Sequence, residues 1–127
     1  MYRCVSLVAV AAMVACAPAA AQVQRNFPQN ALRGTIAIGE APAIVLNGEP
    51  ARLAPGARIR NQANLLETPS ALLGQKFAAH YTLDLGGLVN QVWVLRGDEL
   101  ARRPWPSTAE EASRWLFDPA AQAWTRQ

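Results

Sequence analysis

The stretch KFAAHYTLDLGGLVNQVWVL, residues 76–95, carries the strongest signal for the fold. Every second residue over 77–83 is apolar, and side chains two positions apart lie on the same face of a strand. Gly86-Gly87 then supplies a two-residue turn of the kind that joins antiparallel strands. The stretch therefore predicts a β-hairpin.

The return strand of this hairpin is apolar on both of its faces. Alternation places Val89, Trp93 and Leu95 on one face, and the other face is apolar as well. A strand that is buried on both sides is expected in the centre of a sheet or as a stave of a barrel.

A second hairpin is predicted in RGTIAIGEAPAIVLNGEPARL, residues 33–53. The runs 35–38 and 43–46 are rich in β-branched and apolar residues, as strands are. Asn47-Gly48 is a strong hairpin signal, because a type I′ turn requires positive φ at both central residues. Residues 44–46 should therefore pair with residues 51–53.

Residues 54–73 complete the predicted β-rich part. Pro55-Gly56 predicts a chain reversal, after which residues 57–60 form a further short strand. Residues 61–73 predict a covering loop with one helical turn and with leucines buried beneath it. Five or six short strands favour a mainly β fold, a small, partly open, OB-like barrel with a short C-terminal helix.

The C-terminal helix is predicted from STAE, residues 107–110, which matches a capping box with Ser107 as N-cap and Glu110 at the third helical position. Asp118-Pro119 is expected to end the helix, because the residue before a proline avoids helical backbone. Three apolar residues should pack it on the barrel: Ala112, Trp115 and Leu116.

The start of the chain has the organisation of a secretory signal peptide. Arg3 precedes an apolar run over residues 4–16, and small residues follow as far as Ala21. The run is shorter than the roughly 20 residues of a membrane-spanning helix, so no transmembrane span is expected. We therefore expect export to a bacterial periplasm.

Two processing sites compete. Cleavage after Ala21 discards both cysteines, and it is favoured because Met13 stands where a lipoprotein box usually has leucine. The alternative leaves an acylated Cys16 as the first residue, anchored in the envelope. The favoured cut divides the chain into a signal peptide (1–21), a flexible lead-in (22–32), a barrel (33–100) and a C-terminal helix and tail packed on it (101–127).

Few residue types that support catalysis or metal binding remain after Ala21. Residues 22–127 contain no cysteine or methionine, and His80 is the only histidine, whereas zinc, copper and iron sites combine several such ligands. No metal, cofactor or catalytic residue is therefore expected. His80 shares a strand face with Thr82 and Asp84, which permits a catalytic arrangement, but a strand histidine bonded to a neighbour or to water is the favoured interpretation.

The candidate ligand-binding residues are arginines. The chain has 12 basic and 9 acidic residues, a formal net charge of +3. Arg52, Arg58 and Arg60 fall on neighbouring predicted strands and form a candidate cationic face, which Arg33 could join. The alternative is an ordinary solvated face of the sheet.

Four tryptophans lie in the last third of the chain: Trp93, Trp105, Trp115 and Trp124. Such rings stack on sugars or bases in some binding sites. They more often anchor a terminal helix to a sheet, because each ring buries a large apolar area, and this packing role is favoured.

Three stretches carry a resemblance: VLNGEPARLAPGARIR at 45–60, the hairpin from YTLD at 81–84 to VWVL at 92–95, and the ending with RRPWP at 102–106 and FDPAAQAWTR at 117–126. On these the chain resembles uncharacterised secreted proteobacterial small β-domain proteins, a likeness that implies no activity. Its strand and glycine pattern is also similar to that of periplasmic OB-type barrels, which implies the fold alone.

Together these features predict a non-enzymatic periplasmic module that binds a partner protein or an anionic envelope component. Nucleic acid is not the expected partner. The alternative is a structural or inhibitory envelope lipoprotein anchored through Cys16.

Overall fold

The computed structural model describes residues 24–127, so the predicted signal peptide and Cys16 lie outside the described residues. The elements in chain order are β1 (Leu32–Ile38), β2 (Ala43–Leu46), β3 (Glu49–Arg60), β4 (Leu66–Glu67), the 3₁₀ helix η1 (Pro69–Leu72), β5 (Lys76–Leu83), β6 (Val89–Val94), α1 (Gly97–Leu100), α2 (Ala109–Arg114), β7 (Leu116–Asp118) and β8 (Ala123–Thr125).

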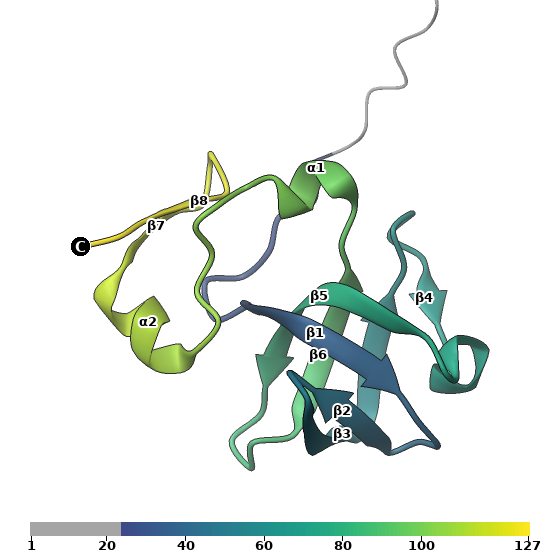
Figure 1. Ribbon diagram of the computed structural model, residues 1–127. Helices are drawn as coiled ribbons and strands as arrows, with labels where there is room; N and C mark the ends of the chain where they lie inside the picture. Colours follow the sequence, from purple (N-terminus) through teal and green to yellow (C-terminus); the bar gives the residue numbers. More distant parts are fainter. Residues whose placement is uncertain (1–23) are drawn as a thin grey trace, which may run out of the picture.

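Five strands close into a barrel in the order β1, β2, β3, β6, β5 and back to β1 (Figure 1). Neighbouring strands of this ring are antiparallel except β3 and β6, which run parallel. The short strand β4 extends the sheet beyond the end of β3. The predicted mainly β fold with a small OB-like barrel is thus confirmed, and its five-stranded ring is closed rather than partly open.

Aliphatic side chains fill the interior of the barrel. Alternation along β1 and β5 sends every second residue inward, which is why the period-two pattern of the sequence locates this core. The core residues are Leu32, Ile36, Ile38, Ile44, Leu53, Ile59, Ala79, Tyr81, Val89 and Val92.

Both predicted hairpins are present, β2 with β3 and β5 with β6. The register expected for the first is wrong, because the two-residue turn pairs residues 44–46 with residues 49–51 and not with 51–53. In the first, Asn47 and Gly48 have φ values of 53° and 82°, as a type I′ turn requires. The Asn47 side chain also accepts a hydrogen bond from the Thr35 amide at 2.9 Å. This bond holds the turn against β1.

The predicted chain reversal at Pro55-Gly56 is wrong. β3 runs through both residues and is 12 residues long. Its register with β6 shifts between Leu53 and Arg58, and Gly56 has a φ of 74°. A glycine with positive φ suits a β-bulge as well as a turn. Here the residue forms a bulge and not a turn, because β3 continues past it, pairing with β2 before it and with β6 on its other side.

The alternation predicted for β6 fails at Asn90. This residue is a bulge, because neighbouring residues of β5 pair with Gln91 and Val89 and none pairs with Asn90. Val89 and Val92 both face the barrel core as a result. Trp93 and Leu95 lie on the outside, in a second cluster. Val89 therefore does not share a face with Trp93, because a bulge exchanges the two faces of a strand.

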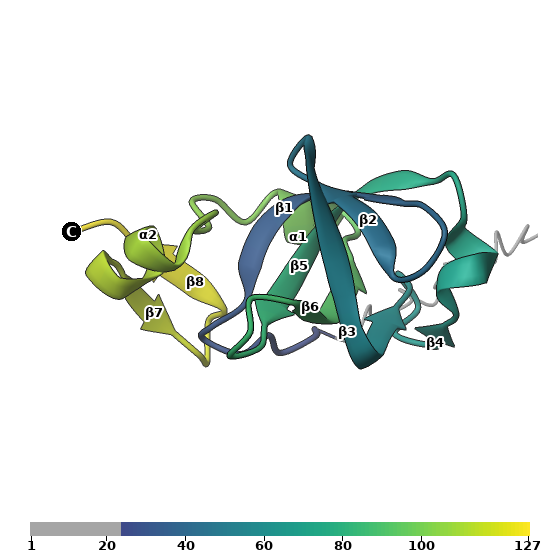
Figure 2. The same cartoon turned by 90° about the horizontal axis from the view of Figure 1, so that it is seen from below.

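The second cluster covers the outer side of the β5 and β6 pair. Its members come from the start of the described chain, from β6 and from the C-terminal segment, which Figures 1 and 2 show at one end of the barrel. The predicted packing role is confirmed for three tryptophans, whose exposed fraction is 8% or less. The buried members are Phe27, Ala31, Trp93, Leu95, Trp105 and Trp124.

The prediction of a flexible lead-in is wrong for residues 24–32. Phe27 is buried, and its amide donates a hydrogen bond to Gln122 Oε1 at 2.8 Å. Arg25 is buried as well. The polar, aperiodic sequence of this segment gives no sign of these contacts, because Glu99 and Gln122 lie 74 and 95 positions away from Arg25 and Phe27.

The helix α2 begins one residue later than predicted. Its N-cap is Thr108, whose Oγ1 accepts a hydrogen bond from the Glu111 amide at 3.2 Å. The capping box expected at Ser107 and Glu110 is therefore displaced by one residue. Both registers place a hydroxyl three positions before a glutamate, so the sequence does not separate them.

The helix also ends earlier than Asp118-Pro119. It stops at Arg114, because residues 116–118 pair with β8 as strand β7. Leu116 is exposed, contrary to its predicted role, whereas Ala112 packs on the barrel core and Trp115 is half-buried against the second cluster.

The covering loop has the predicted helical turn, η1, and Leu72 packs on the core. The expectation that all its leucines are buried is wrong. Leu65, Leu66 and Leu73 are exposed. Of the four leucines in this loop, Leu72 is the one that contacts the barrel core.

Candidate functional site

Two of the predicted arginines share a cleft on the outer face of the barrel. Arg58 and Arg60 pair with Gln91 and Trp93 across the parallel β3 and β6 strands. Together with Val92, these residues line a cleft of about 30 Å³. Arg58 is exposed and Arg60 is half-buried. The structure thus brings two guanidinium groups and an aromatic ring to one place.

No carboxylate neutralises these two arginines among the residues that the structure describes. The ion pairs within residues 24–127 are made by Arg25 and Arg96. Arg60 donates one hydrogen bond, to the carbonyl of Asn64 at 3.4 Å. Most of the donors of both guanidinium groups are therefore available to a ligand.

Arg52 lies on the same strand but at a distance. All three arginines belong to β3 rather than to neighbouring strands, because the chain does not reverse at Pro55-Gly56. Arg52 stands opposite Ala43 of β2 and precedes Arg58 by six residues, about 20 Å along an extended strand. It does not share the cleft.

Arg33 does not join the cationic face. Its guanidinium donates hydrogen bonds to the carbonyl oxygens of Glu99 and Arg102, at 2.8 and 2.9 Å, beside the end of α1. It also lies over the Trp105 ring, 5.5 Å from the centroid. Burial, followed by the charge of Arg103, lowers the pKa of Arg33 to about 10. Arg33 caps the carbonyl end of α1.

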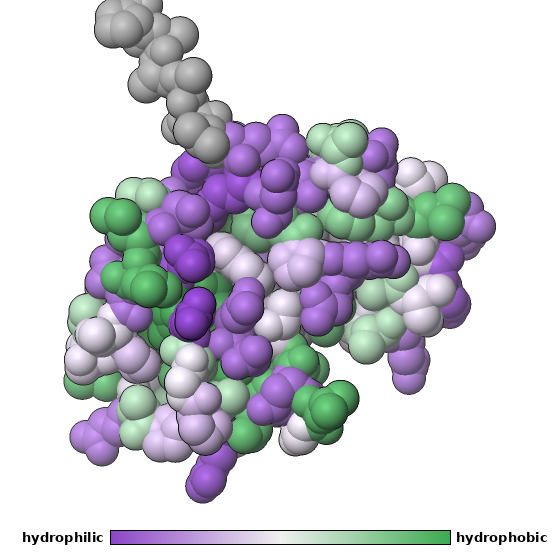
Figure 3. Space-filling model, turned by 180° about the vertical axis from the view of Figure 1, so that it is seen from behind, coloured by the Kyte–Doolittle hydropathy of each residue, from purple (hydrophilic) through white to green (hydrophobic). Residues whose placement is uncertain are grey.

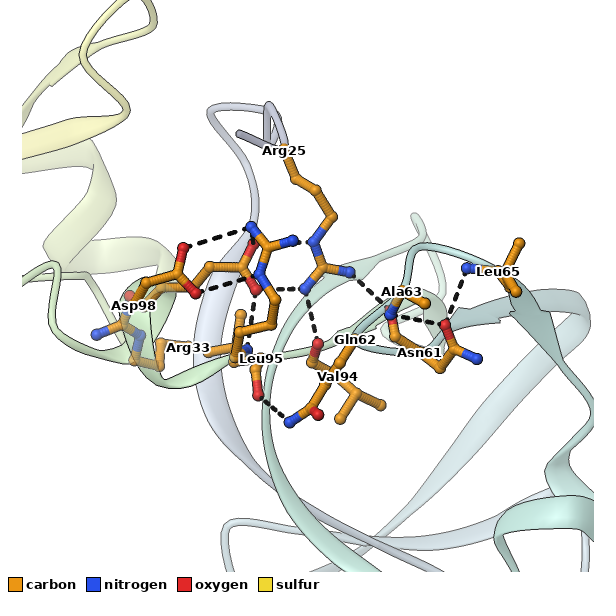
Figure 4. Close-up of polar contacts among 11 residues, drawn as sticks. Arg25, Arg33, Asn61, Gln62, Ala63, Leu65, Val94, Leu95 and Asp98 are labelled. Atoms are coloured by element: carbon orange, nitrogen blue, oxygen red, sulfur yellow. Dashed lines mark hydrogen bonds and ion pairs between the residues drawn. The ribbon is translucent and has the colours of Figure 1, made fainter. Parts of the chain in front are cut away.

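A buried ion pair fixes the start of the described chain, and the sequence contained no signal for it (Figure 4). Arg25 Nε donates to Glu99 Oε2 at 2.8 Å, and Arg25 Nη2 donates to Glu99 Oε1. Arg25 also donates to the carbonyl oxygens of Asn61 and Val94, at 2.9 and 2.7 Å. Glu99 accepts a further bond from the Arg96 amide. A buried charge pair is tolerated only when so fully bonded, so this network is structural.

His80 lies deep in the second cluster. Its ring stacks on Trp105 with 4.1 Å between centroids, and it meets Phe27 edge-on at 4.4 Å. Neither ring nitrogen makes a hydrogen bond of good geometry within the described part of the chain. Burial, followed by the charges of Arg33 and Arg25, lowers the pKa of His80 to about 2. The ring is neutral and enclosed by aromatic side chains.

The catalytic arrangement that the sequence permitted around His80 is not formed. Thr82 is buried. Asp84 accepts hydrogen bonds from the amides of Gly86 and Leu88, each at 2.9 Å, and so holds the hairpin turn. The bond to a neighbour expected for His80 is replaced by aromatic contacts.

A larger pocket, of about 540 Å³, lies between β1, β5 and α2. All the side chains that line it are uncharged, so it offers no charge to an anion. Within residues 24–127, no three or more histidine, cysteine, aspartate or glutamate side chains stand close enough to hold a metal ion. No helix in that same part of the chain has the length and apolarity to cross a membrane. The candidate site is the cleft of Arg58 and Arg60, where the structure keeps two of the three arginines that the sequence proposed.

Comparison of the chain with protein-family models, with curated proteins and with solved structures gives no match. The resemblance to secreted proteobacterial β-domain proteins therefore stays a prediction. The roles of Arg58 and Arg60 are argued from geometry and charge.

Proposed function

We propose that this protein is a non-enzymatic binding module of the bacterial periplasm that holds an anionic envelope component on the outer face of β3 and β6. The observation that carries the proposal is the pair of arginines in one cleft, without a carboxylate partner among residues 24–127. Like charges placed together without compensation cost free energy, which an anionic ligand would recover.

The chemistry of the cleft favours an extended anion. A guanidinium group binds phosphate, sulfate or carboxylate oxygens through paired hydrogen bonds. Gln91 adds amide donors beside Arg58, and Trp93 forms an apolar edge beside Arg60. A cleft of about 30 Å³ is too small for a whole small molecule. The ligand would therefore lie across the surface, as a polymer or a headgroup layer does.

The proposal of a binding role is supported by His80, the residue best suited to acid-base chemistry near pH 7. Its pKa of about 2 and its enclosure by Trp105 and Phe27 keep it from exchanging protons with a substrate. The periplasmic location rests on the signal-peptide pattern of residues 1–21.

The experiment measures binding of dextran sulfate, a soluble polyanion, to the processed protein by isothermal titration at several salt concentrations. Arg58→Glu combined with Arg60→Glu should weaken binding about tenfold or more, and the dependence of affinity on salt should become shallower. Arg103→Glu combined with Arg114→Glu is the matched control, because it changes the charge equally at two exposed arginines elsewhere.

Equal losses in the two double variants would mean that only net charge matters, and the proposed site would be abandoned. Arg52→Glu separates the original three-arginine hypothesis from the two-arginine cleft. We expect Arg52→Glu to leave the affinity within about twofold of the unchanged protein, because Arg52 lies far along the strand.

A further inference from the structure

Three leucines are exposed at the end of the barrel that carries β4 and η1. Leu65, Leu66 and Leu73 expose 63%, 60% and 55% of their surface. In Figure 3, which shows the molecule from behind, apolar atoms gather at the left edge, where β4 and η1 lie, and strongly hydrophilic atoms lie beside them. We name these three residues the leucine patch.

The two arginines of the candidate site border this patch. Arg60 pairs directly with Leu66 across the β3 and β4 strands, and Arg58 lies two residues before Arg60. The carboxylate nearest in sequence, Glu67, is bonded to the Asn61 side chain at 2.8 Å. The patch therefore has an apolar tip, and its flank carries two guanidinium groups against the single carboxylate of Glu67.

The described chain also begins near this end of the barrel. Arg25, which follows the first described residue, donates a hydrogen bond to Asn61, where the segment with the leucine patch starts. The C-terminal segment lies at the other end (Figures 1 and 2). The C-terminal segment therefore does not reach the patch.

We propose that the leucine patch, with Arg58 and Arg60, docks on the surface of an anionic phospholipid membrane. This inference rests on the proposed function and names its anionic partner. Exposed leucines at a loop tip can enter the boundary between headgroups and acyl chains, while guanidinium groups meet the lipid phosphates. A second copy of the chain is a poorer occupant, since it would bring Arg58 and Arg60 of two molecules together.

The test is sedimentation with vesicles of the protein that begins at Gln22, which lacks Cys16 and therefore carries no acyl chain. Vesicles of phosphatidylethanolamine with phosphatidylglycerol should bind the protein about tenfold or more tightly than vesicles of phosphatidylcholine alone. Leu65→Ser combined with Leu66→Ser should weaken binding to the anionic vesicles about tenfold or more.

The matched control is Leu85→Ser combined with Leu116→Ser. Both leucines are exposed, one in the turn between β5 and β6 and one in β7, away from β4. We expect this control to bind the anionic vesicles as the unsubstituted protein does. Denaturation curves of both double variants should be unchanged, which shows that any loss is not unfolding.

The outcomes separate this inference from the proposed function. Absence of vesicle binding, with dextran sulfate binding intact, would overturn the membrane inference alone. Loss of both would overturn the proposed function too. If Leu65→Ser combined with Leu66→Ser abolishes self-association in sizing experiments and leaves vesicle binding unchanged, the patch is an interface between copies, and the membrane inference is wrong.

Discussion

Two pairs of arginines in this domain share a residue type and differ in role. Arg25 is buried and Arg33 is half-buried, and most of their donors are used by Glu99 and by backbone carbonyls. Arg58 and Arg60 lie outside on β3 without a carboxylate partner among the described residues. An arginine whose donors are bonded within the protein is a structural group, whereas one with free donors keeps its charge for a ligand.

The largest effect that would test this contrast between structural and ligand-binding arginines is expected from removing the most buried one, Arg25. Arg25→Met leaves the Glu99 carboxylate buried without its partner, and we expect the free energy of unfolding to fall by about 3 to 5 kcal/mol. Urea denaturation measures the loss. Arg25→Met combined with Glu99→Leu should recover part of it, because no charge then stays buried. A loss below about 1 kcal/mol in the single variant would contradict the structural role.

His80 sharpens the comparison, because the charges of Arg25 and Arg33 help to keep it neutral. Its folded pKa is lowered to about 2, whereas the unfolded value is about 6.5. Below pH 6.5 the unfolded chain binds a proton that the folded chain does not, so stability falls as the pH falls. We expect a loss of about 2 kcal/mol between pH 7 and pH 5.

His80→Phe is the variant that tests this pH dependence. It keeps an aromatic ring against Trp105 and Phe27 and removes two buried nitrogens that lack hydrogen bonds of good geometry. Urea denaturation at pH 7, 6 and 5 should show a shallower decline for the variant. Carboxylates titrate in both proteins, so parallel declines would mean that His80 is not the cause.

Arg126 is an intermediate case, exposed but placed over the Trp115 ring at 5.3 Å from its centroid. Trp115 is half-buried, so Trp115→Ala should cost about 1 to 2 kcal/mol rather than the roughly 3 to 5 kcal/mol of a fully buried ring. Thermal denaturation gives the value. A loss as large as that of Trp105→Ala would show that Trp115 anchors the C-terminal segment as strongly as a core residue.

The smallest effect is expected at the candidate site. Arg58→Glu combined with Arg60→Glu should change the free energy of unfolding by about 0.5 kcal/mol or less, because neither side chain has a buried partner in the described structure. The same variant should lose polyanion binding. A loss of stability above about 2 kcal/mol would place these arginines with Arg25 as structural groups.

The candidate site was half predictable. Arg58 and Arg60 stood out because they flank Ile59, and period two puts both on the face opposite that buried residue. Arg52 and Arg33 did not join them. The position of Arg52 was predicted wrongly because Pro55-Gly56 suits a turn and a bulge alike. The position of Arg33 could not be predicted because the carbonyl oxygens that it bonds lie 66 and 69 positions away in the sequence.

The sequence by itself determined the two hairpins and the aliphatic barrel core. The type I′ turn at Asn47-Gly48 and the alternation over 77–83 depend on residues close together in the sequence, so both can be predicted from it. Only the tertiary structure decided which arginines are buried, why His80 is neutral and which leucines stay exposed. These depend on contacts between residues up to 95 positions apart, and such contacts exist only after the barrel has closed and both ends of the described chain have packed on it.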